Sequence, residues 1–135
     1  MSTTSFSDVV DTIRNDDPRF EKGAYFFVRQ GLDHTIKALK DSPERSSNHV
    51  TGQELLSGIR EFALEQYGPM AFTLLNNWGV RRCEDFGDIV FHLVEAGVLG
   101  RTESDRKEDF AGAYDFEDAF LAPFRPASQR SDSNN

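Results

Sequence analysis

Apolar side chains recur every three or four residues along most of the chain, most clearly over 49–99. This spacing predicts amphipathic helices, because the side chains on one helix face repeat about every 3.6 residues. The first helix of the stretch begins at a capping box formed by Thr51 and Glu54. It ends at Gly68 and Pro69, since proline lacks an amide hydrogen and clashes with the preceding turn.

Two more helices follow in the same stretch. Pro69 fits the first turn of a short apolar helix that ends at Gly79, because glycine adopts the left-handed conformation at little cost. The next helix covers about 84–96 and carries acidic residues in its first turn, where the helix dipole favours negative charge. Gly97 follows its last turn.

Helical patterns also flank the central stretch. A short one covers about 6–16, a longer one covers 24–40, and a last one follows Asp115. The predicted inner face of the longer helix consists of Tyr25, Val28, Leu32, Ile36 and Leu39. Phe26 and Phe27 lie off that face, which predicts that this helix contacts more than one neighbour.

These elements predict a mainly α fold, a compact helical domain of about five to six helices. Short apolar runs at 49–50, 98–102 and 110–114 also fit strands. The order of elements would then be that of a winged-helix module, with a small β-hairpin near 98–114. A plain helical bundle with a looped segment there fits the pattern nearly as well, so both alternatives remain open.

Length and charge narrow the possibilities further. A chain of 135 residues fits one domain. We expect a single helical domain over 1–124, followed by a disordered polar tail over 125–135 that has little to bury. The formal net charge of −8 disfavours general binding to nucleic acids or anionic membranes, because both attract cationic surfaces.

Three features bear on location. Residues 1–20 lack the apolar run of a signal peptide, and no segment is apolar over the length that spans a bilayer. The single cysteine, Cys83, excludes an intrachain disulfide and fits a reducing compartment. The sequence therefore predicts a soluble, cytoplasmic protein that does not act on membranes.

Cys83 follows Arg81 and Arg82 at the predicted start of a helix. Both features would lower the pKa of the thiol and favour the reactive thiolate. However, no histidine is close in sequence and no second cysteine exists, whereas a reactive cysteine generally needs a base or a partner. We therefore favour a helix-cap position at which sulfur replaces a hydroxyl group.

Asp85, Asp88, His92 and Glu95 share one face of the same predicted helix, at spacings of three and four. The last three could supply oxygen and nitrogen ligands to a metal ion. One helix rarely completes a metal site alone, so we favour a solvated acidic face.

Glu61 and Glu65 lie one turn apart on the first central helix. A pair of carboxylates can act as general acid and base. Carboxylates on the outer face of an amphipathic helix are far commoner without such a role, so we interpret both as surface residues. The sequence assigns no catalytic, cofactor-binding or metal-binding residue, and no cofactor.

A winged-helix fold would bring several basic side chains close to phosphates, namely Arg81, Arg82, Arg101, Arg106 and Lys107. The predicted recognition helix argues against this role, because it carries acidic residues and no lysine or arginine. Base reading usually needs arginine, lysine, asparagine or glutamine in the groove. The sequence therefore disfavours nucleic acid as a partner.

Aromatic residues recur towards the C-terminal end of the predicted domain. They are Phe110, Tyr114, Phe116, Phe120 and Phe124. Such a run could line a ligand pocket, but burial of each large apolar side chain contributes roughly 1.5–3 kcal/mol to folding. We interpret the run as a C-terminal clasp over the core, and Trp78 likewise as a core residue.

Three runs resemble a family of small bacterial proteins of uncharacterised function: TGQELLSGIREFALEQYGPMA, WGVRRCEDFGDIVFHLVEAGVL and EDFAGAYDF. The resemblance covers about residues 6–124 and differs at Cys83, where threonine or serine would be expected. It implies a bacterial cytosolic origin and a single domain. It implies no activity and no catalytic residue.

The function predicted from the sequence is a non-catalytic protein-interaction or regulatory module whose partner is another protein. Two alternatives remain open: a winged-helix-like, nucleic-acid-associated regulator, and a small enzyme or thiol sensor that uses Cys83. A deep pocket in which Cys83 or His92 meets converging polar partners would contradict the leading prediction.

Overall fold

The computed structural model describes residues 5–40, 50–99 and 107–125. The helices are α1 (Phe6–Asp16), α2 (Lys22–Lys40), α3 (Gly52–Tyr67), α4 (Ala71–Asn77), α5 (Cys83–Glu95) and α6 (Phe116–Phe120). Three 3-10 helices join or follow them, η1 (Gly68–Met70), η2 (Lys107–Phe110) and η3 (Ala122–Phe124). These ranges contain no strand, so the prediction of a mainly helical domain is confirmed. None of the described helices is both long and apolar enough to cross a membrane.

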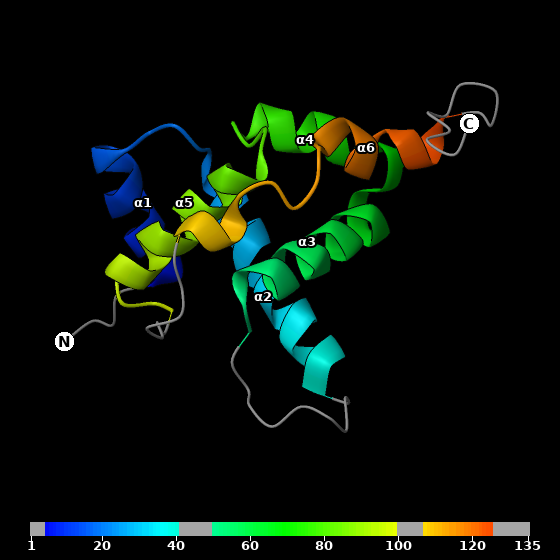
Figure 1. Cartoon of the computed structure of the whole chain (residues 1–135). Coiled ribbons are helices and arrows are strands. Elements are labelled where there is room, and N and C mark those ends of the chain that lie inside the picture. The colour runs from blue at the N-terminus through cyan, green and yellow to red at the C-terminus, as the bar shows by residue number, and fades with distance from the viewer. Residues whose placement is uncertain (1–4, 41–49, 100–106, 126–135) are drawn as a thin grey trace.

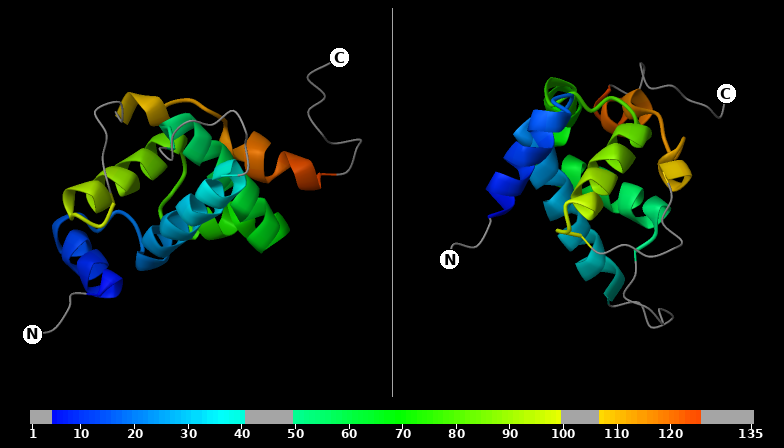
Figure 2. Two further views of the ribbon diagram at one scale, coloured as in Figure 1. Left: turned by 90° about the horizontal axis from the view of Figure 1, so that it is seen from below. Right: turned by 90° about the vertical axis from the view of Figure 1, so that its left-hand side faces the viewer.

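The long helix α2 is the element on which the others assemble. Helices α1, α3 and α5 all pack against it, and α6 packs on α3 and α4 (Figure 1). As a result, α1 and α6 lie at opposite ends of the molecule, with α2, α3 and α5 between them (Figure 2).

The predicted helix starts are confirmed at three caps. Ser5 Oγ accepts a hydrogen bond from the Asp8 amide at 3.1 Å, at the start of α1. Thr51 and Glu54 form both hydrogen bonds of a capping box on α3, at 3.0 and 3.1 Å. Asp115 caps α6 in the same way as Ser5 caps α1. These local signals are why the helix boundaries could be read from the sequence.

The β-hairpin predicted near 98–114 is wrong for the residues that the structure describes. Residues 98–99 form no strand after α5, and η2 occupies the start of the predicted third strand. The helical turn lets Phe110 reach the core, where its ring meets the Phe91 ring edge-on at 6.2 Å between centroids. Residues 100–106 lie outside the described ranges, so no described residue supports a winged-helix fold.

Two other predictions fall at the edges of the described ranges. Val50 is not part of a strand, and His49 lies outside the described residues. Of the predicted polar tail, only Arg125 is described. Its side chain lies 3.7 Å from a carboxylate oxygen of Glu117 on α6.

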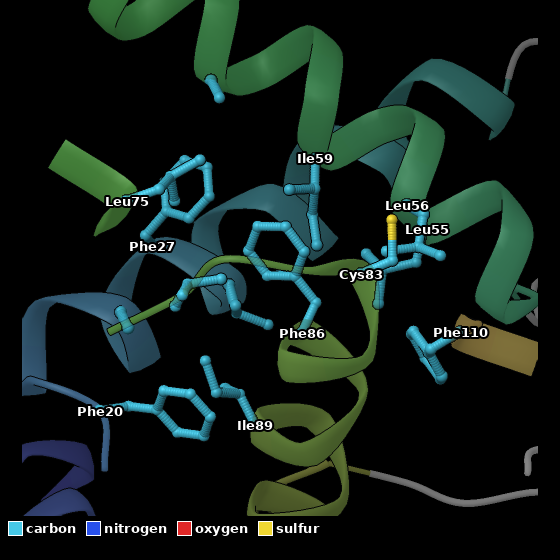
Figure 3. Close-up of a cluster of buried hydrophobic side chains, with 14 of the residues drawn as sticks. Phe20, Phe27, Leu55, Leu56, Ile59, Leu75, Cys83, Phe86, Ile89 and Phe110 are labelled. Carbon is cyan, nitrogen blue, oxygen red and sulfur yellow. The ribbon is translucent and has the colours of Figure 1, made fainter. Parts of the chain in front are cut away.

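The core is rich in phenylalanine and lies between α2, α3 and α5 (Figure 3). The predicted clasp closes one side of it: Phe110, Phe116 and Phe120 are buried. Tyr114 donates a hydrogen bond from its hydroxyl to the Leu56 carbonyl oxygen at 2.8 Å. The clasp is thus confirmed except at Phe124, which is 44% exposed.

The face that α2 buries is rotated from the predicted one. Thr35 is buried, whereas Ile36 is 38% exposed. The reason is a close crossing with α3: a Cβ atom on Gly31 would lie 3.0 Å from Ile59 Cγ1, and one on Gly58 would overlap the Thr35 side chain. Small residues therefore bring the two helix backbones together, and the larger Ile36 is left at the side.

Candidate functional site

An open groove of about 490 Å³ lies between α1 and the C-terminal half of α5. Its lining residues are Val9, Thr12, Ile13, Asp16, Asp17, His92, Glu95 and Ala96. Three of these residues are apolar and three are acidic, and none of the described lining residues is lysine or arginine.

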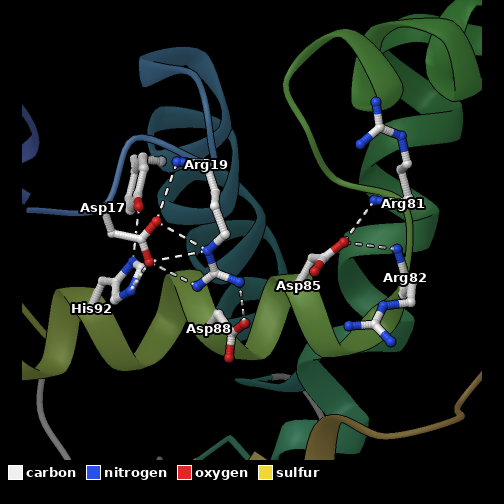
Figure 4. Close-up of polar contacts among 8 residues, drawn as sticks. Asp17, Arg19, Arg81, Arg82, Asp85, Asp88 and His92 are labelled. Atoms are coloured by element: carbon white, nitrogen blue, oxygen red, sulfur yellow. Dashed lines mark hydrogen bonds and ion pairs between the residues drawn. The ribbon is translucent and has the colours of Figure 1, made fainter. Parts of the chain in front are cut away.

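His92 projects from α5 towards the connector between α1 and α2. Its Nδ1 atom lies 2.8 Å from the Tyr25 hydroxyl oxygen, and its Nε2 atom lies 3.5 Å from Asp17 Oδ2 (Figure 4). The imidazole ring is also stacked on the Tyr25 ring, with 6.1 Å between centroids. Both ring nitrogens therefore have partners within the chain, which fix the orientation of the ring.

Arg19 joins the same connector to α5. Its guanidinium group donates hydrogen bonds to both carboxylate oxygens of Asp17, the shortest at 2.8 Å, and one to Asp88 Oδ2 at 3.1 Å (Figure 4). The hydrogen bonds from Arg19 hold the pKa of Asp17 below its usual value. Asp17 is thus ionised and neutralised by its own chain.

Among the described residues in and beside the groove, the hydroxyl groups of Thr12, which lines it, and Tyr25, which contacts His92, are not activated as nucleophiles. The Tyr25 side chain is fully buried, and this burial raises the pKa of its hydroxyl to about 12. Thr12 uses its hydroxyl to donate to the Asp8 carbonyl oxygen of its own helix, at 3.2 Å. The arrangement suits non-covalent binding rather than covalent chemistry.

The predicted acidic face of α5 is wrong for its first three members. Asp85 is only 8% exposed and accepts hydrogen bonds from the amides of Arg81 and Arg82, at 2.9 and 3.2 Å. Asp88 and His92 are partly buried, because each contacts the α1–α2 connector. These side chains point to separate partners, so the alternative of a metal site on this face has no geometric support in the described residues.

Sequence reasoning missed Asp17, Arg19 and Tyr25 as members of the site. Asp17 and the proline after it indicated only a helix end. The contact between Tyr25 and His92 joins positions that are 67 residues apart, so no local spacing could reveal it.

The N-terminus of α5 is not a free anion site. The Asp85 carboxylate already occupies the amides that precede the helix, while the Arg81 and Arg82 side chains are exposed. The side chains of Arg101, Arg106 and Lys107 lie outside the described part of the chain.

Cys83 is the first residue of α5 and is 1% exposed. Its Sγ atom donates a hydrogen bond to the Tyr114 carbonyl oxygen at 3.3 Å, and burial raises the pKa of the thiol. The expected lowering of this pKa is therefore wrong, because loss of hydration outweighs the helix position. The cap role is wrong as well, since Asp85 performs it.

Cys83 is expected to react with an aromatic disulfide reagent at least about 100-fold more slowly in the native protein than in the denatured protein, because the thiol must first be exposed by opening. The release of the coloured thiolate, followed with and without urea, measures this ratio. Equal rates in the two states would return the thiol-sensor alternative to consideration.

Glu61 and Glu65 are exposed, as predicted, and the structure adds a residue that the sequence could not place beside them. His34 of α2 lies next to this pair, with its Nε2 atom 3.2 Å from Glu61 Oε1. This cluster is on a different face from the α1–α5 groove and shares none of its lining residues.

Comparison with known proteins does not assign this chain to a family. The resemblance to a family of small bacterial proteins therefore stays a prediction from the runs within 6–124. No family model, curated protein or solved structure matches the chain.

Proposed function

We propose that the protein is a non-catalytic interaction module that binds a basic, partly apolar segment of another protein in the groove between α1 and α5. The observation that supports this most is the lining of the groove, whose described residues combine apolar side chains with carboxylates and include no lysine or arginine. A segment with the opposite charge and an apolar face would complement both properties.

Two of the groove carboxylates are available to a partner. Asp16 and Glu95 are exposed, and neither carboxylate has a hydrogen bond or ion pair with any described residue. Asp17 differs because Arg19 already neutralises it. A lysine or arginine from the partner would pair with Asp16 or Glu95 while apolar side chains contact Val9 and Ile13.

The overall charge supports the same class of partner. A net charge of −8 accelerates the encounter with a cationic segment and opposes the approach of nucleic acid. The described residues contain no winged hairpin, and the buried thiol of Cys83 does not favour a sensor. The two alternative functions therefore have less support than protein binding.

Charge reversal in the groove tests the proposal. The double variant Asp16→Lys/Glu95→Lys is expected to lower recovery of the partner in affinity purification by at least about ten-fold, because each new lysine repels the cationic segment. Quantitative mass spectrometry of proteins retained from a lysate of the source organism measures the loss.

A matched control carries the same change in charge at two exposed carboxylates outside the groove, Asp33→Lys/Asp118→Lys. It should retain the partner at the wild-type level, and binding of the wild type should weaken as salt increases. Equal losses from the two double variants, or no loss from either, would refute binding in this groove.

A further inference from the structure

A second cluster of polar side chains lies across α2 and α3, formed by His34, Glu61 and Glu65. His34 Nε2 is 3.2 Å from Glu61 Oε1. One ligand-capable atom from each of the three residues lies within 4.8 Å of the others. Among the residues that the structure describes, no other three histidine, cysteine or acidic side chains converge in this way.

The spacing fits a small cation with nitrogen and oxygen ligands. Bonds of about 2.0–2.2 Å around a tetrahedral zinc ion separate neighbouring ligand atoms by about 3.4 Å. The pair His34 and Glu61 already has nearly this separation, at 3.2 Å. Glu65 lies one turn further along α3 and is exposed, so a change of side-chain rotamer can bring its carboxylate to the same ion.

The described residues do not balance the charges at this cluster. Among the described residues, the Glu61 carboxylate pairs with the His34 imidazole, and the Glu65 carboxylate has no hydrogen bond or ion pair. Elsewhere, Asp17 is bound by Arg19 and Asp11 is bound by Lys22. Two carboxylates one turn apart repel each other, and a bound cation would remove that repulsion.

The backbone beneath the cluster is held firmly. His34 precedes Thr35, the residue that packs against Gly58 at the close crossing of α2 and α3. The His34 ring also contacts the Phe62 ring, at 5.3 Å between centroids. An open groove of about 320 Å³ is lined by His34 and Glu61 among others, so water and ions reach the ligand atoms.

We propose that His34, Glu61 and Glu65 bind one zinc ion, which links α2 to α3 and leaves a coordination position for water. One imidazole with two carboxylates favours zinc over magnesium or calcium, which prefer ligand sets made of oxygen alone. The ion would lie outside the α1–α5 groove, so this proposal and the proposed function can fail independently.

Calorimetric titration of the metal-free, full-length protein with zinc chloride tests the site. The wild type is expected to bind one ion per chain. His34→Ala and Glu65→Gln should each weaken this binding at least about ten-fold, since each removes a ligand. Glu65→Gln retains the size and exposure of the side chain, so its effect does not depend on a change in folding.

Two further variants serve as controls. His49→Gln removes a histidine outside the described residues, and Asp33→Asn removes an exposed carboxylate beside His34 in sequence. Both should bind zinc as the wild type does. In addition, zinc should raise the thermal midpoint of the wild type but not that of Glu61→Gln/Glu65→Gln.

Either of two results would overturn the site. One is the absence of saturable binding with zinc present at about 100 μM, because the dissociation constant would then be too high for a functional zinc site. The other is binding that persists unchanged in His34→Ala and Glu65→Gln, because the ion would then be held by other residues.

Discussion

Replacement of Phe27 by alanine is expected to lower the free energy of unfolding by about 3–5 kcal/mol. The side chain is 1% exposed and belongs to the buried core (Figure 3). Its ring lies within 5.6–6.3 Å of four others, measured between centroids: Phe62, Tyr67, Trp78 and Phe86. Alanine would leave a cavity between α2, α3 and α5 that these aromatic rings could fill only in part.

Ile36→Ala is the matched control on the same helix. The sequence pattern placed Ile36 on the inner face of α2, but the side chain is 38% exposed, so its truncation should cost less than about 1 kcal/mol. Urea denaturation followed by circular dichroism gives both free energies of unfolding. Similar losses for the two variants would mean that the face of α2 is not the one described.

The sequence predicts where the helices of this fold lie, but not which face of α2 is buried. Helix positions followed from local signals, such as the capping box of Thr51 and Glu54 and the glycine after α5, and these are confirmed. The rotation of α2 could not follow from hydrophobicity alone. It depends on Gly31 and Gly58, which contribute little apolar surface but allow the backbones of α2 and α3 to approach.

The candidate sites were less predictable for a related reason. Residues such as Asp85 and Asp88 were identified as acidic positions on one helix face, but their roles depend on what lies opposite. Asp85 turns back to cap its own helix, whereas Asp88 meets Arg19, 69 positions earlier in the chain. His34 and Glu61 likewise become neighbours only when α2 and α3 pack. Tertiary contacts, rather than local patterns, assemble both sites.

Replacement of Gly79 by alanine is expected to lower the free energy of unfolding by about 2–4 kcal/mol. Two costs combine at this position. The backbone has φ of +89°, which is unfavourable for alanine, and the new Cβ atom would overlap the Arg19 carbonyl oxygen. The second cost is severe because the Arg19 carbonyl oxygen belongs to the backbone and cannot rotate away as a side chain can. The Glu21 amide also donates a hydrogen bond to the Trp78 carbonyl oxygen at 3.0 Å, which holds the α1–α2 connector against the α4–α5 connector.

Gly97→Ala separates these two costs. Gly97 has a similar φ of +83°, but a Cβ atom there would meet nothing within 4 Å. Its replacement should therefore cost only the conformational part, about 1 kcal/mol. Thermal and urea unfolding of the two variants measure the difference, which isolates the contact between Gly79 and Arg19.

The Gly79 variant also has a consequence for the α1–α5 groove. Displacement of the Arg19 backbone would move the guanidinium group away from Asp17 and Asp88 and release the connector that holds His92 in place. Gly79→Ala should therefore weaken binding of the groove partner in protein that is still folded, whereas Gly97→Ala should not. The two variants could instead lose equal stability and both retain partner binding. That result would show that the α1–α2 and α4–α5 connectors are not coupled through the contact between Gly79 and Arg19.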